Sequence, residues 1–237
     1  MKPVQILVGA MLVLSISPSA AAGARIGLAI APAIVHGGDL SSDLEHPMQE
    51  AIAEMLSWEA SLIQSVRVID PVLLNTNLEK SGWSGRTDLT ETEIEDGRNA
   101  SRQLDADAVL LTRFVHSAGM VDWQVALAYR RETKDLSQRL SGRSREDDFI
   151  LQIRQHALTY LDTIGVKVPP AAYQIVNSRG NVGWEALREY AMGIRDQEAG
   201  KNEEALRHLN EALRRAPFLP SLQVRLKKLE MELQSSR

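Results

Sequence analysis

Hydrophobic residues follow two different spacings over the first part of the chain. The stretch 25–34 is almost continuously apolar and is closed by Pro32 and Gly37, which is typical of a buried strand followed by a loop. Residues 43–62 carry apolar side chains three and four positions apart, which predicts a helix with one buried face. The short β-branched stretch 66–69 predicts a second strand, so the three elements form a strand-helix-strand crossover. The predicted buried face of the helix consists of Leu44, Met48, Ile52, Met55, Leu56, Leu62 and Ile63.

The periodic pattern stops between residues 73 and 87, where asparagines and glycines surround Trp83. We expect a loop there that acts as a mobile flap. The stretch 88–93 is rich in acids and threonines, which is typical of a helix start because carboxylates are stabilised at a helix N-terminus. This helix is expected to run to about Leu104.

A hairpin is predicted in the middle of the chain. Residues 108–115 are apolar and predict a third strand, which a turn at 117–119 would end. Apolar and polar residues alternate over 121–129, which predicts a half-buried antiparallel strand. The charged stretch 134–141 is expected to pair with that strand at the edge of the sheet.

The last third of the chain returns to the helical spacing. An amphipathic helix is predicted over 146–164, and Gly165 ends it. Residues 166–183 have no strong period and are interpreted as a linker. Two further helices are predicted at 184–199 and 202–215. The small and turn-forming residues of this pair resemble a tetratricopeptide (TPR) repeat unit, and they are Gly193, Gly200, Ala205, Leu209, Ala212 and Pro217.

This TPR-like unit suggests a surface for a protein partner, since such units usually bind other proteins. Its predicted groove is apolar with one acid, and its residues are Leu187, Tyr190, Ile194, Gln197 and Glu198. The groove has no Lys or Arg, which argues against a clamp for a peptide carboxylate. The alternative is that Tyr190 and Ile194 pack against the preceding domain, because a single repeat cannot bury its own faces.

After Pro217, leucines recur at helical spacing, which predicts a C-terminal helix. Two heptads alone are marginal for a coiled coil, so a helix that caps the exposed face of the repeat is favoured. Homodimerisation through the same face stays open. The leucines are Leu219, Leu222, Leu226, Leu229 and Leu233.

The N-terminus predicts export. Lys2 precedes an apolar run from Val4 to Ile16, and small residues follow up to Ala24, as in a cleavable signal peptide. The apolar run is shorter than the roughly 20 residues of a spanning helix. The predicted fold class is α/β, a mixed sheet flanked by helices, followed by an all-α TPR-like hairpin and a capping helix. The predicted regions are a signal peptide at 1–24, an α/β domain at 25–165, a linker at 166–183, and the TPR-like repeat with its capping helix at 184–237.

Composition narrows the classes of function. The chain has 237 residues, 44% of them hydrophobic and 5% aromatic, so its core rests on aliphatic side chains. The formal net charge is −4, and loss of Lys2 with the leader makes it one unit more negative, which argues against nucleic-acid binding. The absence of Cys from the sequence excludes disulfides and thiolate chemistry. The common phosphate-loop, dinucleotide-binding and zinc-protease motifs are also absent.

Several short strings resemble the TolB amino-terminal-domain-like family, which includes FlgO-like proteins of bacterial envelopes. Residues 30–32 (Ile-Ala-Pro) match the end of its first strand, 68–70 (Val-Ile-Asp) its second, and 104–110 its entry into the third. The resemblance covers about residues 25–165. Ala33 and Asp105 depart from the family, which usually carries Phe and Gly there. The resemblance implies a fold and an envelope location but no catalytic residues.

Three groups of residues are candidates for a chemical site. The first is a metal-like cluster in the loop after the first strand, for which a solvated loop and helix capping are the favoured interpretation. The second is a basic hairpin, favoured as a charge-protected sheet edge over a site for an anionic partner. The third is Ser84, which lacks the spacing of a nucleophile turn. The cluster comprises His36, Asp39, Asp43, Glu45 and His46, and the hairpin Arg130, Arg131, Lys134, Arg139, Arg143 and Arg145.

The sequence therefore predicts a non-enzymatic, exported protein of the bacterial envelope, periplasmic or peripheral to the outer membrane, that acts as a protein-interaction or assembly module. Its partners would be envelope proteins, and no cofactor, metal or nucleic acid is expected. The alternative is a domain that binds a small molecule or an anionic ligand, with the ligand near His36, Asp39 and Trp83. A hydrolase is the least favoured, because no nucleophile-base pair can be assembled from the sequence.

Overall fold

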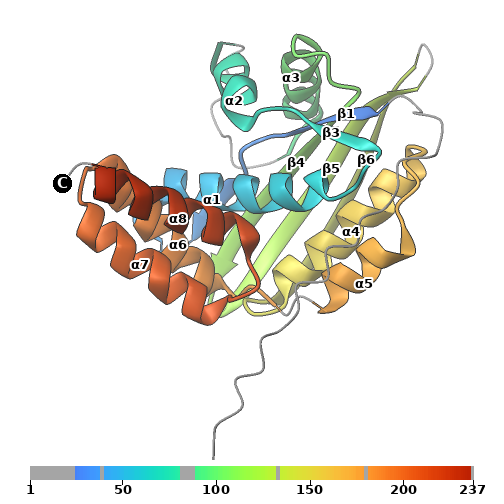
Figure 1. Ribbon diagram of the computed structural model, residues 1–237. Helices are drawn as coiled ribbons and strands as arrows, with labels where there is room; N and C mark the ends of the chain where they lie inside the picture. Colours follow the sequence, from blue (N-terminus) through green and yellow to red (C-terminus); the bar gives the residue numbers. More distant parts are fainter. Residues whose placement is uncertain (1–24, 38–39, 81–88, 132–133, 179–180, 236–237) are drawn as a thin grey trace, which may run out of the picture.

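A mixed β-sheet lies at the centre of the computed structural model, which describes residues 25–37, 40–80, 89–131, 134–178 and 181–235 (Figure 1). Within these residues the sheet has six strands. The strands are β1 (Ile26–Ile30), β2 (Ile34–Gly37), β3 (Val66–Val68), β4 (Ala108–Ser117), β5 (Met120–Arg131) and β6 (Lys134–Arg145).

The strand order is β3-β1-β4-β5-β6, with β2 also paired to β4. The β1–β3, β1–β4 and β2–β4 pairs are parallel, and the β4–β5 and β5–β6 pairs are antiparallel. The single first strand predicted over 25–34 is in fact two strands, since β1 and β2 run along different parts of β4. Pro32 separates them because proline has no N–H to donate to a neighbouring strand.

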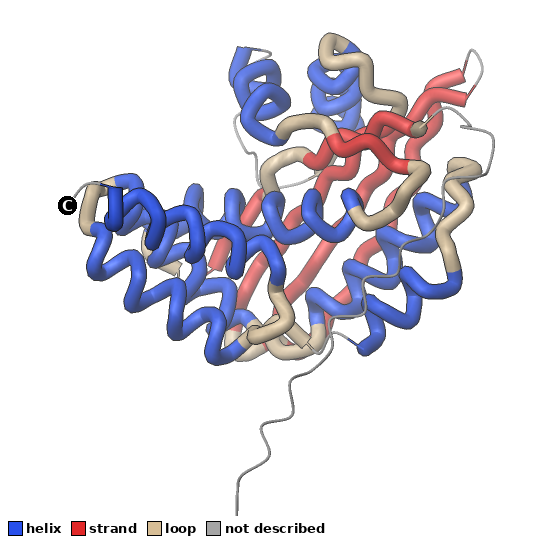
Figure 2. The backbone as a smooth tube through the Cα atoms, in the orientation of Figure 1, coloured by secondary structure: helices blue, strands red, loops and turns tan. Residues whose placement is uncertain are grey.

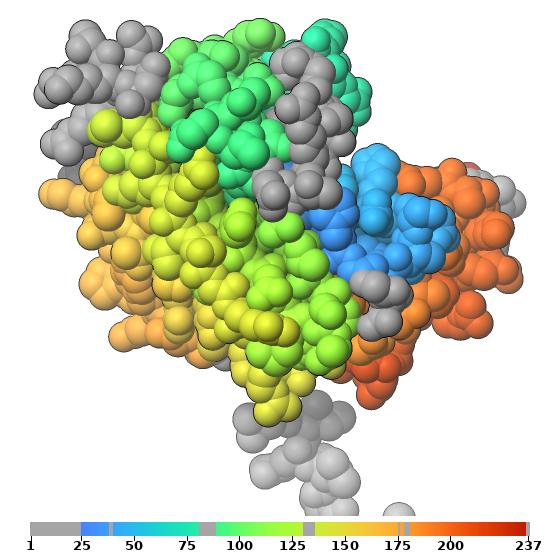
Figure 3. Space-filling view, turned by 180° about the vertical axis from the view of Figure 1, so that it is seen from behind, coloured from blue at the N-terminus to red at the C-terminus, as the bar shows by residue number. Residues whose placement is uncertain are grey.

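Helices cover both faces of the sheet (Figures 1 and 2). One face packs against α1 and α4, and the other against α2 and α3. Figure 3 shows this second face, where the colours of β5 and β6 reach the surface below α3. The helices are α1 (Ser42–Ser61), α2 (Pro71–Lys80), α3 (Glu91–Arg102), α4 (Phe149–Thr163), α5 (Pro170–Ser178), α6 (Trp184–Glu198), α7 (Asn202–Arg215) and α8 (Pro220–Ser235).

Two segments predicted to lack regular structure contain helices. The expected flap begins with α2, in which the Asp70 carboxylate accepts a hydrogen bond from the Val72 N–H at 2.9 Å and Pro71 takes the first helical position. Leu74 and Leu78, one turn apart, are fully buried in the core between the sheet and the helices α2 and α3. The expected linker contains α5, which packs on α4. Residues 81–88, with Trp83 and Ser84, lie outside the described residues.

The other predicted elements are confirmed, and two have clear local causes. Thr90 and Glu93 form a capping box at the start of α3, in which each side chain bonds to the backbone N–H of the other residue. The β4–β5 hairpin turns at Ala118 and Gly119, whose φ angles are 51° and 73°. Both are positive, as a type I′ hairpin turn requires.

Candidate functional site

The α6–α7 hairpin, which the sequence predicts to be TPR-like, is part of the core that also contains the sheet, α1 and α4. Its helices α6 and α7 pack closely because Gly193 leaves room for Leu209, and a β-carbon at Gly193 would lie 2.6 Å from the Leu209 Cδ2. α6 also packs against α1, and α8 contacts both α7 and α1. Figure 1 shows α6, α7 and α8 stacked beside α1.

This packing determines where the predicted partner-binding residues lie. The helices α6, α7 and α8 together form the tail of the chain, residues 184–235. Leu187, Tyr190 and Ile194 have no exposed surface and belong to the core that α1 shares with this tail. Gln197 is half-buried and Glu198 is exposed. In the structure the face of Tyr190 and Ile194 packs against α1, and the partner-binding role of these residues stays a prediction.

A network of polar contacts joins α1, α6 and α8 within this packing. The Tyr190 hydroxyl donates a hydrogen bond to the Glu54 carboxylate of α1. The Arg225 guanidinium of α8 pairs with Glu50 and Glu54, and its Nη1 donates to the Gln197 Oε1 at 3.0 Å. Burial, followed by the negative charge of Glu54, raises the pKa of Tyr190 well above its usual range. The hydroxyl therefore stays protonated and available as a donor.

A second link between α1 and α6 involves Asp43, a residue of the metal-like cluster for which helix capping is favoured. The Arg195 Nη1 of α6 donates to the Asp43 Oδ2 of α1 at 3.0 Å. Hydrogen bonds from Ser41 and then Arg195 lower the pKa of Asp43. The His36 Nδ1 lies 3.8 Å from the Glu45 Oε1, and Asp39 lies outside the described residues. Among the residues that the structure does describe, no group of three or more His, Asp or Glu side chains is placed to hold a metal ion.

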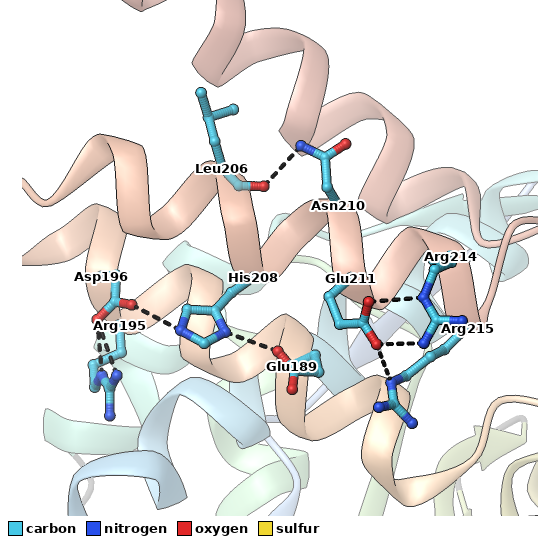
Figure 4. A network of polar contacts seen from close by, with 9 residues as sticks. All are labelled: Glu189, Arg195, Asp196, Leu206, His208, Asn210, Glu211, Arg214 and Arg215. Carbon is cyan, nitrogen blue, oxygen red and sulfur yellow. Dashed lines mark hydrogen bonds and ion pairs between the residues drawn. The ribbon is translucent and has the colours of Figure 1, made fainter.

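A further set of charged side chains lies on α6 and α7 (Figure 4). His208 stands between two acids, with its Nδ1 at 2.8 Å from the Glu189 Oε2 and its Nε2 at 3.5 Å from the Asp196 Oδ2. Farther along α7, Glu211 accepts hydrogen bonds from Arg214 and Arg215, and the bond from Arg214 is the main reason that its pKa falls to about 2. The Glu211 contacts pair opposite charges at the surface, where such ion pairs contribute little to stability.

The basic hairpin is partly neutralised by neighbouring acids. The Arg139 Nη2 lies 2.7 Å from the Glu91 Oε1 of α3, and the Arg143 Nε lies 3.5 Å from the Asp122 Oδ1 of β5. The side chains of Arg130, Arg131 and Lys134 lie outside the described part of the chain. The sheet ends at β6, as the sequence predicts.

An apolar cavity of about 320 Å³ lies between the sheet and the helices α1, α4 and α5. Its floor is formed by side chains of β1, β4 and β5, and its other sides by the end of α1, the middle of α4 and the start of α5. It lies apart from His36, the described residue at which the sequence predicted a ligand. The cavity is lined by Leu28, Ile30, Leu56, Glu59, Ala60, Leu62, Ile63, Gln64, Leu110, Leu127, Arg154, Ala157, Leu158, Leu161, Pro169, Ala171, Ala172 and Val176.

The cavity exists because the facing helices carry alanines where larger side chains would meet. Ala60 comes from α1, Ala157 from α4, and Ala171 and Ala172 from α5. Larger aliphatic side chains at these positions would fill the space, as close packing normally does in a protein interior. Leu62, 43% exposed, lies among the lining residues and opens the cavity to solvent.

One ion pair lines this otherwise apolar cavity. The Arg154 Nε donates to the Glu59 Oε2 at 3.0 Å, and the Arg154 Nη2 lies 2.7 Å from the Glu59 Oε1. The side chains of Arg154 and Glu59 are only 1% and 12% exposed. One hydrogen bond and one close ion-pair contact thus join α1 to α4, and a charge-assisted hydrogen bond of this kind is stronger than one between neutral groups. The sequence analysis missed the site. A usable signal exists, because Arg154 lies four residues after the buried Ile150 in the amphipathic helix, and a charged residue on the apolar face of such a helix is unusual.

Comparisons with known proteins give partial similarities. No family model matches the chain, and no curated protein matches it. Three solved structures are similar to parts of the chain. The LpoB C-terminal domain from Salmonella enterica is 11% identical, with 53% of this chain and 87% of that chain covered and a TM-score of 0.33. Lipoprotein GNA1162 from Neisseria meningitidis is 16% identical, with 61% and 100% covered and a TM-score of 0.34.

The third structure is the hypothetical protein CT253 from Chlamydia trachomatis, at 14% identity, with 52% of this chain and 74% of that chain covered and a TM-score of 0.31. Among the described residues of the present chain, no helix is both long and apolar enough to cross a membrane. At this level of similarity, function has to be argued from the chain's own residues.

Proposed function

We propose that the protein is a non-enzymatic binding protein of the bacterial envelope that holds a small, largely apolar ligand between α1, α4 and α5. The observation that carries this proposal is the cavity of about 320 Å³ with its mainly aliphatic lining and single ion pair. Ligand pockets typically measure about 300–1,000 Å³ and combine apolar walls with a few fixed polar groups. Small-molecule binding, the alternative predicted from the sequence, is thus favoured over the adaptor role. The proposed site is the cavity beside α1, α4 and α5 instead of the region near His36.

The envelope location rests on the sequence. The charged start, the apolar run and the small residues up to Ala24 support export, and the resemblance to the TolB-like family points to the periplasm. In this proposal the exported chain begins near residue 25, and residues 25–165 and 184–237 form one folding unit. The contacts of α6 and α8 with α1 support that view.

Binding of a neutral fluorescent dye tests the pocket. N-phenyl-1-naphthylamine, an uncharged aromatic dye, is expected to bind the wild-type protein with increased fluorescence. Ala157→Phe places a ring in the cavity from α4 and is expected to weaken binding at least about tenfold, which equals about 1.4 kcal/mol. The matched control is Thr159→Phe, which adds the same ring at an exposed position of α4. Equal affinities in wild type and Ala157→Phe would contradict the proposal.

The adaptor role keeps one structural candidate, the outer face of α8. Val224 and Met231 lie seven residues apart and are 58% and 53% exposed, so they can form an apolar seam with a second copy of α8. If homodimerisation uses this seam, the double variant Val224→Glu/Met231→Glu is expected to sediment as a monomer in analytical ultracentrifugation. Gln234→Glu, at an exposed position of the same helix, should leave the dimer intact. A monomeric wild-type protein at high concentration would rule the seam out.

A further inference from the structure

We propose that the Glu59–Arg154 pair makes the cavity selective for uncharged aliphatic ligands and against acidic ones. This inference rests on the proposed function, because it assigns a ligand class to the same cavity. The ligand class is an aliphatic chain with an uncharged head group, such as a hydroxyl or an ester, that is enclosed beside the ion pair.

The first step is the charge of the cavity. Glu59 and Arg154 are the charged residues among those that line it, and they carry opposite charges. Their two contacts, a hydrogen bond at 3.0 Å and an ion-pair contact at 2.7 Å, hold the two charges side by side. The cavity therefore presents no net charge to a ligand.

The second step is the cost of adding a charge. A carboxylate that enters an apolar cavity loses its hydration and needs a cation to replace it. The nearby cation is Arg154, but its charge is already paired with that of Glu59. A third charge would leave one carboxylate poorly compensated, whereas an uncharged head group leaves the pair intact.

The third step is the size of the ligand. A volume of about 320 Å³ holds about ten groups of the size of a water molecule, at about 30 Å³ each. An unbranched chain of about nine carbons with a small head group fits that space. Such a chain enclosed in the cavity brings its head group close to one of the lining groups, of which Glu59 and Arg154 are the charged members.

Two probes of equal chain length test the inference, namely 1-nonanol and nonanoate at pH 8, measured by isothermal titration calorimetry or by displacement of the neutral dye. The wild-type protein is expected to bind 1-nonanol at least tenfold more tightly than nonanoate. Equal binding of the two probes overturns the selectivity while leaving the pocket proposal intact. Failure of both probes overturns the selectivity as well. The proposed function itself is contradicted only if the dye also binds wild type and Ala157→Phe with equal affinity.

A single charge change should reverse the preference. Glu59→Gln keeps the shape of the side chain but removes the negative charge that is paired with Arg154, so the affinity for nonanoate is expected to rise at least tenfold. Glu59→Gln/Arg154→Gln removes both charges and should abolish that gain. The matched control is Glu230→Gln, the same charge change at an exposed position of α8. An unchanged nonanoate affinity in a folded Glu59→Gln protein means that the head group lies away from the pair and overturns the inference. If Glu59→Gln does not fold, the wild-type comparison decides alone.

Discussion

Tyr190→Ala is expected to lower the free energy of unfolding of the whole protein by about 3–5 kcal/mol, the usual loss for a fully buried aromatic residue. Tyr190 has no exposed surface, and its hydroxyl donates to Glu54 of α1. The truncation opens a cavity between α1 and α6 and removes a donor from Glu54. Because these helices share one core, guanidinium unfolding should show a single transition at a lower midpoint.

The matched control is Tyr190→Phe, which keeps the ring and removes the hydroxyl. Its loss should be about 1 kcal/mol, because Arg225 still pairs with Glu54. Two separate transitions in Tyr190→Ala, with the α/β domain unfolding at the wild-type midpoint, would show that the tail is an independent unit. That outcome would contradict the single folding unit proposed for residues 25–165 and 184–237.

Arg154→Ala is expected to destabilise the protein by about 3–5 kcal/mol, because removing one partner of a buried ion pair leaves the other charge uncompensated. Glu59 is only 12% exposed, so water can hydrate its carboxylate only in part. The free energy of unfolding from urea denaturation measures this loss.

The double variant Glu59→Leu/Arg154→Leu provides the control. It removes both charges and replaces them with aliphatic side chains, so most of the lost stability should return. A double variant as unstable as Arg154→Ala would assign the loss to packing around Arg154 rather than to the unpaired carboxylate. A loss below about 1 kcal/mol in Arg154→Ala would mean that the pair is solvated like a surface ion pair.

Much of the fold could be predicted from the sequence because its signals are local. The spacing of Leu44, Met48 and Ile52 predicted α1 to within one residue at each end. The helices of the tail were predicted with similar accuracy because Gly200, at φ 70°, marks the turn between them. Such features depend on neighbours within a few residues of each other.

The secondary-structure predictions were wrong mainly where the same residues are compatible with two different elements. Asp70-Pro71 can end a strand or begin a helix: the strand predicted over 66–69 stops there, and the Asp70 carboxylate also caps α2. Pro32 can likewise end a strand or interrupt one, and the chain resumes pairing with β4 two residues later. The stretch that forms α5 is short and lacks a clear period, and its packing on α4 supplies what the sequence pattern does not.

The candidate site was largely beyond prediction. A groove that binds a partner and a face that packs on α1 would both consist of apolar residues. The residue types of Leu187, Tyr190 and Ile194 therefore cannot distinguish a binding groove from a packed face. The cavity depends on alanines from three helices that meet only in the folded protein. Of its residues, only Arg154 carries a local signal, a charge on an otherwise apolar helix face.

The contact between α8 and α1 has a consequence for how the chain acquires its structure. Arg225 and Glu50 are 175 residues apart in the sequence, so α1 cannot bury its outer face until nearly the whole chain is available. Contacts of such long range slow folding, because the connecting chain must first be ordered. The outer face of α1 would therefore stay uncovered until synthesis is almost complete. Such a delay is compatible with the export proposed for this protein.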